Sequence, residues 1–325
     1  MIRLDFNENP HPPPRIVVEE ARRGLSEVTR YCEVKYLEEL KLLIGEYTNI
    51  PRDRIIVSPG SDIILREIIH TFSVNRKVIM LNPSFFPALE CARRHSRKIL
   101  KFQVTPPDFK LNAEILMKEI KEPSLVIIDN PNNPTGMEFL NHDLVIKLLD
   151  NKNTMLVIDE AYYEFSRKTF SGLISNYSNL AITRTLDKGF SLAGLRIGFL
   201  LAGDMFKEGL SDFATILPRP SVYAAIAALK NREYVRENVE RIISERERLI
   251  SELKELGVEA YPSATNFILI RSDILGLSEK LRIKGIAIKD LSSEWIPGYY
   301  RVSIGLPEEN DFLVKSLKEL LNYES

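Results

Sequence analysis

Apolar residues between about residue 54 and residue 202 fall in short runs that alternate with amphipathic segments. The runs are rich in β-branched residues and are bounded by turn residues, which is typical of buried strands. Strands are expected at residues 54–58, 77–81, 98–104, 124–129, 154–159, 180–184 and 196–202. Fully apolar strands that alternate with helices indicate a parallel sheet covered on both faces.

The segments between the early strands have the periodicity of helices with one apolar face. Residues 62–72 place Ile64 and Ile68 on one side, and residues 141–150 repeat the pattern. The expected fold class is therefore α/β, with a mostly parallel seven-stranded sheet covered by helices.

A different pattern begins after the "LPRP" segment at residues 217–220. The elements expected there are a charged helix at 233–256, strands at 266–272, 284–290 and 299–305, and a closing helix to Leu321. These elements indicate a smaller α+β unit, and the N-terminal segment is too short to fold alone. We expect a large domain of residues 28–230 and a small domain of residues 1–27 with residues 231–325.

Composition excludes several classes of function. The chain has 325 residues, with 44 basic and 45 acidic side chains, so no dedicated nucleic-acid or anionic-membrane surface is expected. It has no long uncharged apolar run and no apolar core in its charged opening segment, so neither a membrane span nor export is expected. Cys32 and Cys91 have no metal-like spacing to another cysteine or histidine, so we expect no metal and a reducing cytoplasm.

Candidate binding residues directly follow the first two strands, where ligands of open α/β sheets lie. In "VSPGSD", Gly60 allows close approach, and the amides of Ser61 and Asp62 at a helix N-terminus would bind an anion such as phosphate. Serine and aspartate are also ordinary helix caps. In "NPSFFPALE", Phe85 would place its ring over the site, although a core phenylalanine fits the same pattern.

Polar residues also follow the next two strands. The rigid "DNPNNPTG" loop can aim Asn133 at a ligand oxygen, and "VIDEAYYEF" places Asp159 at a strand end with Tyr162 three positions later. A carboxylate that ends a buried strand must find a partner or shift its pKa. We therefore expect a cationic partner for Asp159.

The segment "TRTLDKGFSLAGLRIGF" places Lys188 among small and apolar residues, with Thr185 and Arg196 nearby. Such surroundings disfavour the ammonium form, lower the pKa and favour attack on a carbonyl. A loop lysine with a solvated tip is the alternative.

One ligand, pyridoxal 5'-phosphate, has a group for each of these places. Its phosphate suits the cluster of Gly60, Ser61, Asp62, Thr185 and Arg196. Its ring suits Phe85, its phenolic oxygen Asn133 and Tyr162, its ring nitrogen Asp159, and its aldehyde Lys188.

The motifs "NPNNPTG", "DEAY" and "KGFSLAGLRIG" together resemble those of the fold type I pyridoxal-phosphate enzymes. The chain is most similar to the class I/II aminotransferases, in their histidinol-phosphate aminotransferase branch, from "LDFNENP" to "YYRVSIGLPEEN". The resemblance implies that Lys188 forms the internal aldimine, Asp159 pairs with the ring nitrogen, Tyr162 and Asn133 hold the phenolic oxygen, and Phe85 stacks on the ring.

The resemblance also implies residues for the substrate and the partner subunit. Arg301 matches an arginine that grips the substrate carboxylate or phosphate, and Tyr31 matches a tyrosine that reaches the cofactor phosphate of the partner subunit. A homodimer with sites at its interface is therefore expected, acting on an amino donor and a 2-oxo acid such as 2-oxoglutarate, as in histidine biosynthesis.

Two features depart from this family pattern: Asp187, and the "YCE" at residues 31–33, which stands in place of the usual "YPD" in the loop that carries Tyr31. Asp187 stands where a hydroxyl residue usually precedes the lysine, so it is expected to pair with a base such as Arg184, or else to weaken cofactor binding. The string from Gly285 to Asn310 is equally similar to threonine-phosphate decarboxylases of cobalamin synthesis. Lys289 is expected either to contact a substrate phosphate or to be a surface lysine. A catalytically idle pyridoxal-phosphate sensor is the remote alternative.

Overall fold

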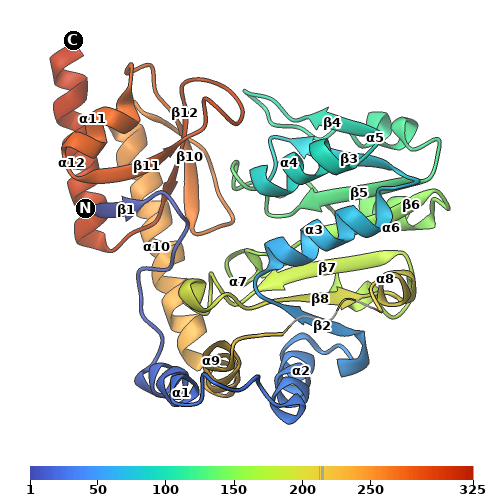
Figure 1. Cartoon of the computed structure of the whole chain (residues 1–325). Helices are drawn as coiled ribbons and strands as arrows, with labels where there is room; N and C mark the ends of the chain where they lie inside the picture. Colours follow the sequence, from blue (N-terminus) through green and yellow to red (C-terminus); the bar gives the residue numbers. More distant parts are fainter. Residues whose placement is uncertain (212, 214–215, 325) are drawn as a thin grey trace.

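The computed structural model describes residues 1–211, 213 and 216–324, which form two β-sheets and the helices that cover them (Figure 1). The larger sheet has seven strands in the order β2-β8-β7-β6-β5-β3-β4. Its strands are β2 (Ile55–Ser58), β3 (Lys77–Asn82), β4 (Ile99–Gln103), β5 (Ser124–Asp129), β6 (Thr154–Asp159), β7 (Leu180–Thr185) and β8 (Gly198–Ala202). β8 is antiparallel to both β2 and β7, while the other pairs are parallel. The predicted fold class is confirmed.

Both faces of this sheet are buried, because successive side chains of a strand point to opposite faces. In β5, Leu125 and Ile127 belong to one apolar cluster, while Val126 and Ile128 belong to the other. The first cluster includes residues of α3 (Ser61–Phe72), α4 (Phe86–His95) and α8 (Asp204–Gly209). The second includes residues of α2 (Val34–Thr48), α5 (Ala113–Glu119), α6 (His142–Asp150) and α9 (Arg219–Lys230). Helices therefore cover the sheet on both sides.

The smaller sheet has the order β1-β11-β12-β10-β9. Its strands are β1 (Ile2–Leu4), β9 (Glu259–Ala260), β10 (Phe267–Arg271), β11 (Ile286–Asp290) and β12 (Tyr299–Ser303). The helices of this part are α10 (Glu233–Glu255), α11 (Leu277–Ile283) and α12 (Pro307–Glu324). β1 pairs in parallel with β11, so the N-terminal strand lies at the edge of this sheet, and the closing helix α12 packs against α10 in the same part of the molecule (Figure 1).

The remaining α-helices are α1 (Arg15–Leu25), which packs against α9, and α7 (Tyr163–Ser166), which follows β6. The division of the chain at residues 27 and 230 stays a prediction. β8 begins at Gly198 rather than at residue 196, because Arg196 has the left-handed backbone conformation (φ 53°), which no strand adopts. Within the described residues, no helix is long and apolar enough to cross a membrane.

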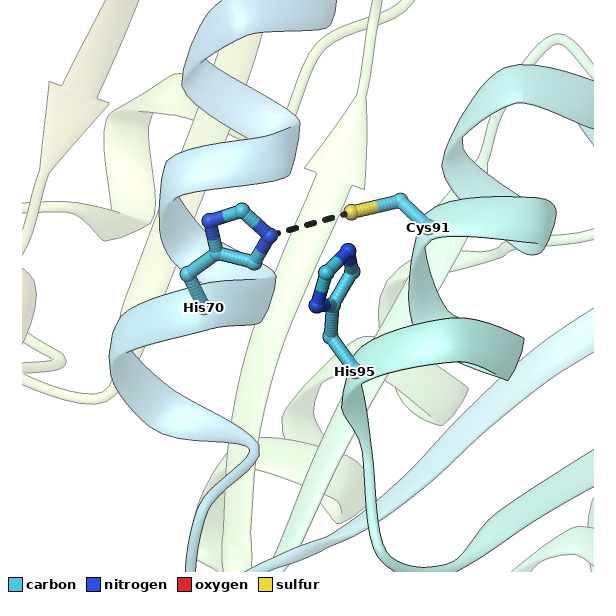
Figure 2. A group of neighbouring side chains, drawn as sticks. All are labelled: His70, Cys91 and His95. Carbon is cyan, nitrogen blue, oxygen red and sulfur yellow. Dashed lines mark hydrogen bonds between the residues drawn. The ribbon is translucent and has the colours of Figure 1, made fainter.

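α3 and α4 lie side by side on one face of the larger sheet. Both helices begin at the carboxyl-end edge of the parallel strands and end at the opposite edge. At that opposite edge, His70 of α3 lies against Cys91 and His95 of α4 (Figure 2).

Candidate active site

A cavity of about 520 Å³ lies at the carboxyl ends of the parallel strands, where the smaller sheet faces the larger one. Its walls include most of the residues singled out in the sequence: Ser61, Asp62, Phe85, Asn133, Asp159, Tyr162, Thr185, Lys188, Arg196, Lys289 and Arg301. Gly60 precedes the lining residue Ser61, and Tyr31 lies elsewhere. Residues that are far apart in the sequence meet here because parallel strands end at one edge of the sheet.

Asp159 ends β6 and is buried at the floor of the cavity. Burial raises the pKa of its carboxyl to about 7, although a hydrogen bond donated by the Thr183 hydroxyl (2.7 Å) favours the ionised form. No cation contacts this carboxylate among the residues that the structure describes. A protonated ligand nitrogen at this place would favour the charged carboxylate.

Asp129, which ends β5 in register with Asp159, organises the neighbouring loops. Its carboxylate accepts hydrogen bonds from the Ser84 hydroxyl (2.8 Å) and from the backbone amides of Asn133 (2.8 Å) and Phe85 (3.2 Å). Burial raises its pKa to about 6 against these bonds. Asp129 was not among the residues predicted from the sequence, although the strand-end rule applied to Asp159 describes it equally well.

The phenol of Tyr162 receives two amide donors. Its oxygen accepts hydrogen bonds from Asn7 Nδ2 (2.9 Å) and Asn133 Nδ2 (3.4 Å), and its ring packs edge-to-face on Phe267. Burial raises its pKa to about 12. Asn7 was not predicted as a site residue, although it belongs to the "LDFNENP" motif that carries the family resemblance. It is buried with a positive φ of 54°, and its backbone amide donates to Ser303 Oγ (2.8 Å).

Lys188 is half-buried, and its Nζ donates a hydrogen bond to the carbonyl oxygen of Phe6 (3.2 Å). Burial lowers its pKa to about 8, while the neighbouring Asp187 carboxylate acts in the opposite direction. The direction of the shift is the one predicted from its apolar neighbours. About a tenth of this amine is therefore uncharged and nucleophilic at pH 7, against well under a thousandth of an ordinary lysine.

Arg301, on β12, reaches the cavity from the smaller sheet. Its two terminal nitrogens donate to Asn133 Oδ1 (2.7 Å) and to the carbonyl oxygen of Asp5 (2.6 Å). Its buried Nε has no hydrogen-bond partner among the described residues. Burial lowers the pKa of the guanidinium. A carboxylate or phosphate ligand would satisfy this buried cation by charge-assisted hydrogen bonds.

Asp187 pairs with a base, as predicted, but that base is Arg196 and not Arg184. Asp187 forms an ion pair with Arg196, and the same guanidinium also contacts the carboxylate of Asp62. Side chains alternate along β7, so Thr183 and Thr185 face the site while Arg184 points to the other side of the sheet. Asp187 therefore finds its cation at Arg196.

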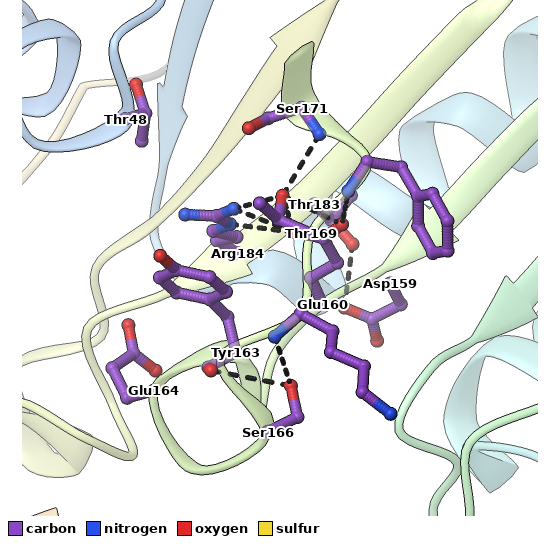
Figure 3. A network of polar contacts seen from close by, with 12 residues as sticks. Thr48, Asp159, Glu160, Tyr163, Glu164, Ser166, Thr169, Ser171, Thr183 and Arg184 are labelled. Atoms are coloured by element: carbon purple, nitrogen blue, oxygen red, sulfur yellow. Dashed lines mark hydrogen bonds and ion pairs between the residues drawn. The ribbon is translucent and has the colours of Figure 1, made fainter. Parts of the chain in front are cut away.

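Arg184 belongs instead to a buried polar network behind Asp159 (Figure 3). Its guanidinium pairs with Glu160 (2.8 Å), donates to the Thr169 hydroxyl (2.6 Å) and stacks over the ring of Tyr163 (3.6 Å). Glu160 also accepts a hydrogen bond from the backbone amide of Phe170 (2.9 Å). Because Asp159 and Glu160 are adjacent, this network holds the end of β6 in place.

The N-terminus of α3 forms one wall of the cavity beside Arg196. Gly60 has a positive φ of 91°, and its carbonyl accepts a hydrogen bond from the Ser58 hydroxyl (2.6 Å). A Cβ on Gly198 of β8 would overlap the Ser61 amide nitrogen, so only glycine allows this close approach. The free amides and the helix dipole make this N-terminus a favourable place for an anion.

Comparison with known proteins agrees with this geometry. Residues 1–317 match the family model described as aminotransferase class I and II. The chain belongs to this family. The predicted resemblance is confirmed.

Relatives of this aminotransferase include proteins of known name. It is 39% identical to a histidinol-phosphate aminotransferase from Sulfurisphaera tokodaii, over 98% of this chain and 90% of that protein. The solved structure of a histidinol-phosphate aminotransferase from Sinorhizobium meliloti, in complex with pyridoxal-5'-phosphate, has a TM-score of 0.90 at 23% identity. This match covers 100% of this chain and 91% of that chain. The solved structure of L-threonine-O-3-phosphate decarboxylase from Porphyromonas gingivalis has a TM-score of 0.85 at 20% identity. This match covers 99% of this chain and 100% of that chain. The two structural matches show the fold alone.

Lys289 lies in the cavity of this aminotransferase, whereas Tyr31 lies outside it. Lys289 lines the cavity, where its Nζ pairs with Glu294 (2.5 Å). Tyr31 is 79% exposed, and its backbone carbonyl oxygen accepts a hydrogen bond from the Arg219 guanidinium (2.7 Å). Tyr31 thus does not contribute to the cavity of its own chain, and its role toward a partner subunit stays a prediction.

Proposed function

We propose that this aminotransferase uses pyridoxal 5'-phosphate to transfer the amino group of histidinol phosphate to 2-oxoglutarate. The observation that carries the proposal is that Lys188 and Asp159, an amine and a buried carboxyl with opposed pKa shifts, face one cavity. The similarity to the Sulfurisphaera tokodaii protein supports the choice of donor.

The residues around the cavity fit this cofactor. The buried Asp159 carboxyl suits a protonated ring nitrogen, and the Tyr162 phenol and Asn133 amide suit a ring oxygen. The α3 N-terminus at Ser61 suits the phosphate, and the Phe85 ring on the cavity wall suits a flat aromatic ligand. Asp129 holds the loops that carry Asn133 and Phe85. When bound, the cofactor supplies an electron sink for bonds at the substrate Cα.

The chain's own residues position the substrate and move its proton. Lys188 Nζ, with a pKa of about 8, would be the general base that takes the proton from the donor Cα and passes it to the bound cofactor, and the same amine would run this transfer in reverse for the acceptor. Arg301 binds the charged end of the donor or acceptor, so it orients the bond at Cα that breaks. Lys289 lies on the same wall and, released from Glu294, binds a substrate phosphate.

Further parts of the proposal concern assembly and location. A homodimer is proposed in which Tyr31, exposed in the single chain, contacts the cofactor phosphate of the partner subunit. The near-neutral charge balance and the two free cysteines support a cytoplasmic location.

The test mixes cofactor-loaded enzyme with histidinol phosphate and 2-oxoglutarate and follows the glutamate formed. Lys188→Ala is expected to abolish both turnover and the visible absorption of a lysine-bound cofactor. The matched control is Lys230→Ala, because Lys230 is an exposed lysine paired with Glu39 far from the cavity. This variant is expected to keep both.

A second arm offers threonine phosphate and follows released carbon dioxide. Glutamate without carbon dioxide supports the proposal. Carbon dioxide from threonine phosphate, with no glutamate from histidinol phosphate, would contradict the proposed activity while leaving the cofactor assignment intact.

A further inference from the structure

Three side chains with metal-binding atoms meet at the ends of α3 and α4 that lie away from the active site (Figure 2). His70 lies in the last turn of α3. Contrary to the expectation from the sequence, Cys91 does have a metal-like spacing to a histidine: His95 is four residues further along α4, so the two side chains share one face of that helix. With a rise of about 1.5 Å per residue, His70 lies roughly 14 Å along α3 from Ser61. The cluster is therefore separate from the cavity.

The distances in this cluster are close to those of a metal site. Cys91 Sγ lies 3.7 Å from His70 Nε2, and the potential ligand atoms of all three residues lie within 4.8 Å of one another. Tetrahedral zinc, with bonds of about 2.3 Å to sulfur and about 2.0 Å to nitrogen, places these two atom types about 3.6 Å apart. The sulfur of Cys91 and the nitrogen of His70 already have this spacing. A rotation of the exposed His95 side chain would bring its ring nitrogen to the same spacing from the other two ligand atoms.

We propose that His70, Cys91 and His95 bind one divalent transition-metal ion of borderline softness, with zinc as the reference ion. A thiolate with two imidazoles is a donor set that prefers zinc and similar ions over magnesium or calcium. Cys91 is buried while both histidines are exposed, so the ion enters from solvent and a water completes its coordination. The open position does not face the active-site cavity, so the ion has a structural role.

Nearby charges do not block this site. Arg66 and Arg94 are the cations that act on the Cys91 thiol. Arg94 pairs with Glu90 (3.8 Å), which also pairs with Arg93 (3.0 Å), so part of the positive charge is neutralised. When the ion binds, the Cys91 thiol loses its proton, so a divalent ion adds only one net positive charge to the cluster.

Metal binding would tie α3 to α4. The same two helices carry active-site residues at their other ends, with Ser61 and Asp62 in the first turn of α3 and Phe85 as the residue that caps α4. The ion is therefore expected to stabilise the folded chain without taking part in the reaction.

The first test titrates the chelator-treated, cofactor-loaded protein with Co²⁺, a spectroscopic substitute for zinc. One ion per chain is expected, with the charge-transfer absorption of a thiolate ligand. His70→Ala, Cys91→Ser and His95→Ala are expected to weaken binding about tenfold or more, since loss of even an outer contact to a metal site costs 10- to 100-fold. Both histidines are exposed, so their replacement leaves no core cavity.

Matched controls are Cys32→Ser and His142→Ala, which remove the other cysteine and an exposed histidine outside the cluster. Both are expected to bind Co²⁺ like the parent protein, and their spectra also account for any absorption of the cofactor. Zinc is expected to raise the thermal unfolding midpoint of the parent and of both controls, but not of the cluster variants.

Two outcomes would overturn the proposal. The first is unchanged affinity in Cys91→Ser or His70→Ala. The second is Co²⁺ binding without thiolate absorption, which would show adventitious binding to surface histidines only. Neither readout depends on which amino donor the enzyme uses.

Discussion

At the residue scale, Asp187 decides how much positive charge a phosphate meets in this site. Its carboxylate and that of Asp62 both contact the Arg196 guanidinium, so a bound phosphate competes with two carboxylates for one cation. Asp187 is also buried, and burial raises its pKa even though Arg196 lowers it. The ion pair with Arg196 thus explains how a carboxylate is tolerated here, and we expect it to lower the affinity for the cofactor phosphate.

Asp187→Asn is expected to tighten pyridoxal-phosphate binding about fivefold, because one of the two carboxylates that compete for Arg196 loses its charge. Fivefold corresponds to about 1 kcal/mol, a small value because the partly exposed Arg196 is screened by solvent. The amide keeps an oxygen that can accept the hydrogen bond from the Ile197 backbone amide. Equilibrium titration of the cofactor-free protein, followed by fluorescence, measures the change. Asp204→Asn, at an exposed aspartate paired with Arg54, is expected to leave the affinity unchanged. Weaker binding in Asp187→Asn would instead mean that the carboxylate's hold on Arg196 organises the site.

At the scale of elements, the active site depends on the close packing of β8 against the start of α3. Gly198 pairs with Ser58 of β2, and a Cβ there would overlap the backbone of Gly60 and Ser61. The amides at the N-terminus of α3 can line the cavity only because this strand position lacks a side chain.

Gly198→Ala is expected to push the first turn of α3 outward, lower the free energy of unfolding by about 1–3 kcal/mol and weaken cofactor binding. The matched control is Gly194→Ala, because a Cβ at Gly194 has no neighbouring atom within 4 Å. This control is expected to change neither quantity. Denaturant unfolding and cofactor titration measure the two effects, and equal behaviour of both variants would contradict the packing argument.

At the scale of the whole molecule, several buried carboxyls make stability depend on pH. Burial raises the pKa of Asp129 to about 6 and those of Asp159 and Glu164 to about 7. The folded chain therefore binds more protons than the unfolded chain between the ordinary carboxyl pKa and about pH 7. The contribution of these protonated carboxyls to the free energy of unfolding is therefore largest at low pH. It is lost as the pH rises through their pKa values in the folded chain, between about 6 and about 7.

Glu164→Gln tests this contribution, because Glu164 is buried and accepts a hydrogen bond from the Tyr47 hydroxyl (2.9 Å) that glutamine can also accept. The advantage of the cofactor-free variant over the parent in unfolding free energy is expected to be about 1–2 kcal/mol larger at pH 8 than at pH 5, because the folded-state carboxyl ionises only near pH 7. Denaturant titrations at the two pH values measure the difference. Glu240→Gln, at an exposed position, is the control. The same difference at both pH values would show that charge is not the cause.

The linear sequence by itself determined the larger sheet and most of the candidate site. Apolar runs the length of a strand, such as residues 124–129, become buried strands because both faces of a parallel sheet are covered. Residues that end or follow these strands, such as Asp159 and Lys188, meet because the strand ends share one edge. Local pattern is sufficient for both inferences.

Only the tertiary structure decided which distant side chains meet. Asn7 reaches Tyr162 across 155 positions, Asp187 pairs with Arg196 rather than Arg184, and His70 joins a helix that begins at residue 86. Each of these contacts depends on which face a side chain occupies and on how two elements pack. The spacing of residues along one segment does not reveal which face a side chain occupies or which elements pack together. Both are set only when the sheet and helices have assembled.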